Sequence, residues 1–103
     1  MKSVTKIYVN KVNVIIHFSL PNDSTLIKFD FVDDKPKIWY VTNGSLEFKK
    51  VYVYVTSDNI IMPNNYECEY IGSAKDVREK MWHAFEMFDC EPIHGMQLYE
   101  IKL

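Results

Sequence analysis

The stretch that decides the predicted fold is VNVIIHFSLPNDSTLIKFDF, residues 12–31. Apolar and polar side chains alternate on both sides of the turn formers at residues 21–24, and a period of two is typical of half-buried strands. If residues 21–24 close a hairpin loop, the large apolar side chains face one another across two antiparallel strands. The expected pairs are Leu20 with Thr25, Phe18 with Ile27, Ile16 with Phe29, and Val14 with Phe31. A shift by one residue would turn one apolar set to solvent, so this register predicts a hairpin.

Three further turns extend the pattern in both directions. They are a type I′ turn at Asn43 and Gly44, a five-residue loop over residues 33–37, and a two-residue turn at Asn10 and Lys11. Asn-Gly is the strongest short hairpin signal because both central positions of a type I′ turn need positive φ. These turns would pair Trp39 with Phe48, Phe31 with Trp39, Val9 with Val12, and Ile7 with Val14. The first half of the chain is therefore expected to form an antiparallel meander.

The parity of the apolar residues changes after Phe48. The apolar residues that follow lie at odd positions, namely Val51, Val53 and Val55. A β-bulge at Lys49 and Lys50 would bring them back to the same face of the sheet. The alternative is a straight strand that turns Tyr52 and Tyr54 inward, but it also points Lys50 at the core, which is costly. We expect the bulge, with Tyr52 and Tyr54 on the second face of the sheet.

Residues 73–88 change to a helical period. Their apolar side chains follow the i, i+4, i+7, i+8, i+11 spacing of one helix face: Val77, Met81, Ala84, Phe85 and Phe88. Ser73 is a good N-cap with Asp76 three residues later, and Pro92 marks the end of the helical segment. The pattern predicts one amphipathic helix.

The predicted fold is α+β in a single domain, residues 1–103. A curved antiparallel meander of six to seven strands packs on the amphipathic helix at about residues 73–88. The other expected elements are a turn at residues 62–65, a strand at 66–71, and a final edge strand at 97–103. A sheet covered by one helix leaves its second face open, and Tyr40 is expected there beside Tyr52 and Tyr54.

Length and charge narrow the function. The chain has 103 residues, a formal charge of −2, and no apolar run near the roughly 20 residues of a membrane span. The first residues carry no secretory signal pattern, so we expect a cytoplasmic protein with reduced cysteines and no membrane partner. The negative formal charge argues against a nucleic-acid partner held by phosphate neutralisation. The lysines are also spread along the chain and Arg78 is its one arginine, so we expect no nucleic-acid partner.

No motif in the sequence implies a reaction. His83, Cys90 and His94 cluster late in the chain, and with Cys68 they are the candidate ligands for zinc. No C-x2-C pair supports such a site, and a cysteine in mid-strand is more often a small buried hydrophobe. Cys90 is also the candidate nucleophile, but acidic residues flank it on both sides and disfavour the thiolate. We therefore expect no metal, no cofactor and no enzymatic activity.

Aromatic residues outside the predicted core indicate a binding surface. On the expected helix, Trp82 lies at the flank of the apolar face, one turn from Arg78. Tyrosine and tryptophan are enriched at the hot spots of protein interfaces. We expect a small non-enzymatic protein-binding module whose contact residues are Tyr40, Tyr52, Tyr54, Arg78 and Trp82. The preference for residues with AT-rich codons further indicates a phage or mobile-element accessory protein that inhibits a host enzyme or defence system by docking in the host cytoplasm.

Three alternatives use the same parts of the chain differently. A small-molecule carrier would have Phe18, Phe29, Phe31 and Trp39 lining a cavity under the helix. A zinc-supported enzyme would be built on the late histidines and cysteine. Homodimerisation would cover the open tyrosine face of the sheet with a second copy of the chain.

Overall fold

The computed structural model of the chain describes residues 1–58 and 67–88. In these two segments all regular structure is β, with seven strands and no helix, so the predicted α+β class is wrong. The strands are β1 (Ser3–Tyr8), β2 (Ile15–Pro21), β3 (Thr25–Val32), β4 (Lys35–Thr42), β5 (Phe48–Ser57), β6 (Glu67–Lys75) and β7 (Met81–Phe88). The turn expected at 62–65 and the strand expected at 97–103 lie outside the described residues.

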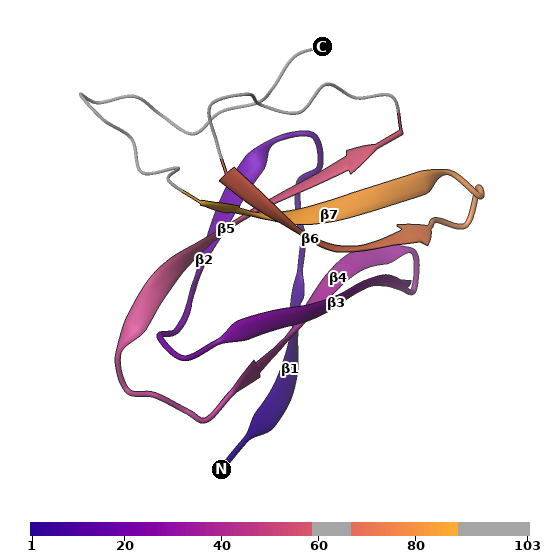
Figure 1. The fold of residues 1–103 in the computed structure, drawn as a ribbon. Coiled ribbons are helices and arrows are strands. Elements are labelled where there is room, and N and C mark those ends of the chain that lie inside the picture. Colours follow the sequence, from indigo (N-terminus) through magenta and orange to yellow (C-terminus); the bar gives the residue numbers. More distant parts are fainter. Residues whose placement is uncertain (59–66, 89–103) are drawn as a thin grey trace.

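The strands form two antiparallel sheets (Figure 1). β1, β4 and β3 make a three-stranded sheet with β4 in the centre, and β2, β5, β7 and β6 make a four-stranded sheet in that order. Among these strands, only β3–β4 and β6–β7 are neighbours both in sequence and in a sheet. The chain therefore crosses between sheets where a meander was predicted.

The core lies between the two sheets. Ile38 of β4 and Val53 of β5 are both 0% exposed. The other buried members of this main core are Val9, Leu20, Phe29, Val51, Val55 and Ala84. The layers approach closely where Gly72 of β6 lies against the backbone of Phe29 in β3. Removal of this apolar surface from water is the main force that holds the sheets together.

The predicted first hairpin is wrong although its turn is present. The backbone N of Ser24 donates to the Pro21 carbonyl at 2.9 Å. However, β2 pairs with β5, where Phe18 faces Val51, and β3 pairs with β4. Ile27 is skipped in the β3–β4 register and is 49% exposed. A tight turn can join strands of different sheets as well as strands of one hairpin, so turn length alone does not choose between them.

β1 also has a different partner from the one predicted. It pairs with β4, with Ile7 opposite the centre of that strand, so the pairs predicted across the turn at residues 10–11 are wrong. Asn13, with a φ of 61°, lies where the chain enters β2. Its backbone N donates to the Val55 carbonyl at 2.7 Å, and its side-chain oxygen accepts from Thr56 Oγ1 at 3.0 Å. These contacts attach the chain just before β2 to β5.

The loop between β3 and β4 is shorter than predicted. Asp33 and Asp34 have φ values of 52° and 62°, and two positive values are typical of a type I′ turn. The connection is therefore a two-residue turn instead of a five-residue loop. As a result, Phe31 faces Pro36 and not Trp39.

The predicted hairpin at Asn43 and Gly44 is not formed, because this loop carries the chain from β4 into the other sheet. Of these two residues only Gly44 has a positive φ, 83°. Asp23 holds the loop, since its carboxylate accepts from Thr42 Oγ1 at 2.6 Å and from the Asn43 backbone N at 2.9 Å. The bond from Thr42 is the main reason that the pKa of Asp23 lies below its ordinary value.

β5 is continuous and covered on both faces. It pairs with β2 without a break at Lys49 and Lys50, so the predicted bulge is wrong. The valines of β5 face the main core, while Tyr52 and Tyr54 are 7% and 0% exposed on the opposite face. The remaining members of this second cluster are Ile15, Met87 and the partly buried Phe85. Two of the three tyrosines expected on an open sheet face, Tyr52 and Tyr54, are therefore buried.

The helix predicted over residues 73–88 is instead the hairpin of β6 and β7. Ser73, the expected N-cap, faces His83 across the two strands. β7 is covered on both faces, since Ala84 belongs to the main core and Phe85 packs on the second cluster. Apolar residues at both parities remove the alternation of a half-buried strand and resemble a helical spacing.

Candidate functional site

The turn of the β3–β4 hairpin meets the turn of the β6–β7 hairpin. The backbone N of Val77 donates to Asp34 Oδ1 at 3.4 Å, although the two residues are 43 positions apart. A pocket of about 270 Å³ lies beside this contact. Its lining residues are Val12, Phe31, Asp34, Pro36, Asp76, Val77, Arg78 and Trp82. The lining of the pocket combines apolar residues with two aspartates and one arginine.

Asp76 organises the β6–β7 turn, which Glu79 closes with a φ of 64°. Asp76 Oδ1 accepts hydrogen bonds from the backbone N of Arg78 at 2.8 Å and from the backbone N of Lys80 at 3.0 Å. Its Oδ2 accepts from Trp82 Nε1 at 3.0 Å. The bond from Trp82 is the main reason that the pKa of Asp76 lies below its ordinary value, and the two backbone donors lower it further.

These contacts hold the Trp82 indole at the pocket. The side chain is half-buried, and Lys80 Nζ lies 4.7 Å from the ring centroid. Val77, which is 70% exposed, and Arg78, which is also exposed, complete the rim. The turn and the start of β7 therefore present an aromatic ring, an aliphatic side chain and a cation together.

The pocket contains two of the five contact residues predicted from the sequence, Arg78 and Trp82. Tyr40 is half-buried against the main core, and Tyr52 and Tyr54 are buried in the second cluster. None of these three tyrosines lines the pocket. The pocket residues from the first half of the chain were not predicted as part of the binding surface, because they reach the tryptophan only through the tertiary structure. Phe31 was expected at a cavity, but only in the carrier alternative.

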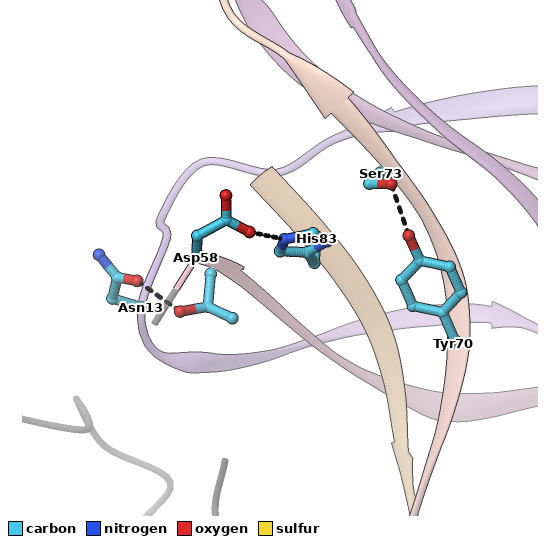
Figure 2. Close-up of polar contacts among 6 residues, drawn as sticks. Asn13, Asp58, Tyr70, Ser73 and His83 are labelled. Carbon is cyan, nitrogen blue, oxygen red and sulfur yellow. Dashed lines mark hydrogen bonds and ion pairs between the residues drawn. The ribbon is translucent and has the colours of Figure 1, made fainter. Parts of the chain in front are cut away.

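A polar cluster lies beside the ends of β5 and β7 (Figure 2). Figure 2 shows Asp58 and His83 pointing toward one another, and His83 Nε2 is bonded to Asp58 Oδ1. On β6, the hydroxyl of Tyr70 is hydrogen-bonded to Ser73 Oγ at 2.5 Å. The Tyr70 and His83 rings are 6.4 Å apart, so the two pairs are neighbours.

This cluster does not assemble a nucleophile with a base. Ser73 faces His83 in the β6–β7 register, which places a hydroxyl and an imidazole on neighbouring strands. Activation of the hydroxyl would need a hydrogen bond between the two groups. In the part of the chain that the structure describes, the Ser73 hydroxyl is hydrogen-bonded to Tyr70, and the His83 ring is hydrogen-bonded to Asp58. The contacts instead connect the end of β5 to β7.

The candidate metal ligands are not brought together in the described segments. Cys68 is an exposed free cysteine on β6, and His83 is paired with Asp58. Cys90 and His94 lie outside the described residues. Within residues 1–58 and 67–88, no group of three or more His, Cys, Asp or Glu side chains could hold a metal ion. That the protein acts without a metal remains a prediction.

Residues 1–93 match the model of the family described as domain of unknown function DUF7352. The chain belongs to this family. The matched range contains β1 to β7, and therefore both the pocket and the polar cluster. Comparisons with curated proteins and with solved structures found no match. Among the residues that the structure describes, no helix has the length and apolar character needed to cross a membrane.

Two carboxylates face each other across the β6–β7 hairpin. Glu69 lies opposite Glu86 in the strand register. Burial raises the pKa of Glu86, the charge of Lys49 acts against this rise, and the charge of Glu69 adds to it. Ionised Glu86 therefore lowers the free energy of unfolding at neutral pH.

Glu86→Gln is expected to raise the Tm at about pH 7, because it removes this ionised group. The pKa of Glu86 in the folded protein lies above its ordinary value of 4.5, so the destabilisation is present above the folded pKa and disappears as the pH falls toward 4.5. Thermal melts over this range should show the gain over the wild type shrinking as the pH falls. Glu47→Gln, at an exposed loop position, controls for the loss of a surface charge. An equal gain at every pH would contradict the role assigned to Glu86.

Proposed function

We propose that this domain is a non-enzymatic binding module that docks onto another protein through the pocket between its two hairpin turns. The observation that carries this proposal is the half-buried Trp82, which Asp76 holds beside Val77 and Arg78. Tryptophan and arginine are enriched at interface hot spots. A ring that is already oriented loses little conformational entropy when a partner binds.

The size and lining of the pocket indicate the chemistry of the partner. A volume of about 270 Å³ is below the roughly 300–1,000 Å³ that encloses a drug-sized ligand, so it suits one inserted side chain. The walls from Phe31 and Pro36 favour an apolar side chain. Asp34 and Asp76 already accept hydrogen bonds from the domain itself, whereas the Arg78 guanidinium at the rim favours a neighbouring acid on the partner.

The small-molecule carrier has weaker support. Of the four aromatic residues expected to line its cavity, only Phe31 lines this pocket. Phe29 is 4% exposed in the packed main core, and Phe18 packs against the same core. Trp39 lies opposite Lys28 in the β3–β4 register, on the other face of the three-stranded sheet from the core.

Val77→Glu and Trp82→Ala are each expected to weaken partner binding at least tenfold, about 1.4 kcal/mol. The first places a charge over the apolar pocket, and the second removes the aromatic anchor. A partner captured from lysate by the wild-type chain is purified, and its affinity for each variant is measured by calorimetry.

Leu46→Glu is the matched control, because Leu46 is a 95% exposed apolar residue that does not line the pocket. This variant should bind the partner as the wild type does. If Val77→Glu binds as tightly as Leu46→Glu, the docking surface lies elsewhere. Circular dichroism melts establish that each variant is folded, and Val77→Glu decides the test if loss of the bond to Asp76 unfolds Trp82→Ala.

A further inference from the structure

The outer face of the three-stranded sheet carries lysines and aromatic side chains. Alternate residues of β4 point to opposite faces, and Ile38 points into the core, so Lys37 and Trp39 point outward. Residues directly opposite them in β1 and β3 share this outer face. The resulting lysine–aromatic face consists of Lys6, Tyr8, Lys28, Lys35, Lys37 and Trp39.

Lysine side chains approach both aromatic rings of this face. Trp39 lies between Lys6 and Lys28 in the strand register, and Lys28 Nζ is 4.9 Å from the ring centroid of Trp39. Tyr8 is 45% exposed and faces Lys37, whose Nζ is 4.9 Å from the Tyr8 ring centroid. Cations and π-faces are therefore interleaved on one surface.

The face is cationic although the chain is not. Its four lysines are accompanied by one acidic residue within the paired strands, Asp30 opposite Lys37, whereas the whole chain has a formal charge of −2. The sequence alone argued against nucleic acid because the formal charge is −2, Arg78 is the one arginine, and the lysines are spread along the chain. The strand register gathers lysines from residues 6–37 onto one surface, which removes the last of these three arguments.

We propose that the lysine–aromatic face binds single-stranded nucleic acid, with bases stacked on the rings and phosphates paired with the lysines. Aromatic platforms within a positively charged surface are typical of proteins that bind single strands with little sequence preference. Tyr8 and Trp39 occupy diagonal positions on neighbouring strands, a spacing of roughly 7–8 Å. Two bases of one strand can therefore stack on the two rings.

A single strand fits this face better than a duplex or an acidic peptide. The bases of a duplex are stacked on one another and do not reach the rings. An acidic peptide would use the lysines and leave the rings without a role. The lysines over the rings are held by exposed cation–π contacts, which are weaker than base–aromatic stacking, so a base can displace them toward a phosphate. Arginine, the residue that most often reads base edges, is absent from the face.

The test is a titration of the full chain by fluorescence anisotropy against three labelled probes. They are an oligothymidylate of about 12 nucleotides, a duplex of the same length, and a poly-glutamate of similar charge. The oligothymidylate should bind most tightly, with an affinity that falls as salt rises. Trp39→Ala and Lys28→Glu should each weaken its binding at least tenfold. Lys50→Glu makes the same charge change on β5, outside the face, and should alter the affinity less than twofold.

Three results would overturn the proposal. The first is no binding of the oligothymidylate, and the second is equal binding of the oligothymidylate by Trp39→Ala and the wild type. The third is binding of poly-glutamate that is as tight as that of the oligothymidylate and is unchanged in Trp39→Ala. The last result would identify an acidic peptide as the ligand. Acetylation footprinting of the wild type needs no variant: the oligothymidylate should protect Lys28 and Lys37 but not Lys50, and equal modification with and without it would also reject the proposal.

Discussion

Replacing Tyr54 with alanine is expected to lower the free energy of unfolding by about 3–5 kcal/mol. The side chain is 0% exposed and packs with Tyr52 and Met87 in the second cluster, so its removal leaves a cavity between packed strands. The hydroxyl is buried and has no hydrogen-bond partner among the described residues. Tyr54→Phe should therefore be as stable as the wild type or more stable, because it removes an unsatisfied polar group. Urea unfolding curves give both values.

The matched control for this prediction is Tyr70→Ala, because Tyr70 is 54% exposed on a neighbouring part of the same sheet. It should cost about 1–2 kcal/mol, because it removes the hydrogen bond to Ser73 and the ring contact with Phe85. If Tyr54→Ala costs no more than Tyr70→Ala, then Tyr54 is not interior. The sequence-based prediction of an exposed Tyr54 would then be restored.

Ile38→Ala is expected to lower the free energy of unfolding by about 2–5 kcal/mol. Ile38 is 0% exposed, lies in the central strand of the three-stranded sheet, and faces both Ile7 and Phe29. The deletion therefore opens a cavity where the two sheets pack. Chemical unfolding measures the effect directly.

Ile27→Ala provides the comparison, because Ile27 is the residue that the sequence placed in the core opposite Phe18. It is 49% exposed and lies outside the β3–β4 register, so its truncation should change stability by about 0.5 kcal/mol or less. Both variants remove the same side-chain atoms, so a difference in stability between them reports the position in the sheet and not the type of side chain. A larger loss for Ile27→Ala than for Ile38→Ala would support the predicted hairpin instead of the observed sheets.

Local patterns located strands but not their partners. The turn formers at residues 21–24 and 43–44 do separate strands. The alternation of β2 is present, whereas the predicted alternation of β3 is interrupted at Ile27. A hairpin and a crossing between sheets use turns of similar length, and nothing near a turn distinguishes them. β2 pairs with β5, where Ile15 faces Tyr54, and this contact depends on residues that no short window contains.

The error over residues 73–88 has a different physical cause. A strand with one solvent-exposed face shows apolar residues at a period of two. β7 packs on both faces, so its successive residues Ala84 and Phe85 are both apolar and the period is lost. Asp76 suits the first turn of a helix. Its carboxylate equally suits a tight loop, where it can accept hydrogen bonds from the backbone N–H groups. The pairing of β7 with both β5 and β6 decides between these interpretations.

Part of the candidate site could be predicted. Arg78 and Trp82 were expected to be neighbours on a helix, and they are neighbours because the turn held by Asp76 brings them together. Pro36 was not predicted as a pocket residue, and Phe31 was expected at a cavity only in the carrier alternative, since the pocket forms only where two distant turns meet. The lysine–aromatic face was hidden for the same reason, because it depends on the register between β1, β3 and β4.

The crossing topology also has a consequence for folding kinetics. Pairing β1 with β4 joins Ser3 to Thr42, and pairing β2 with β5 joins Ile15 to Tyr54, so long loops must close before these contacts stabilise anything. Non-local β topologies fold over roughly milliseconds to seconds. The β3–β4 and β6–β7 hairpins close locally and can order first. The turns of these two hairpins line the pocket. Each half of the pocket can therefore form before the slow step, and the slow step brings the two halves together.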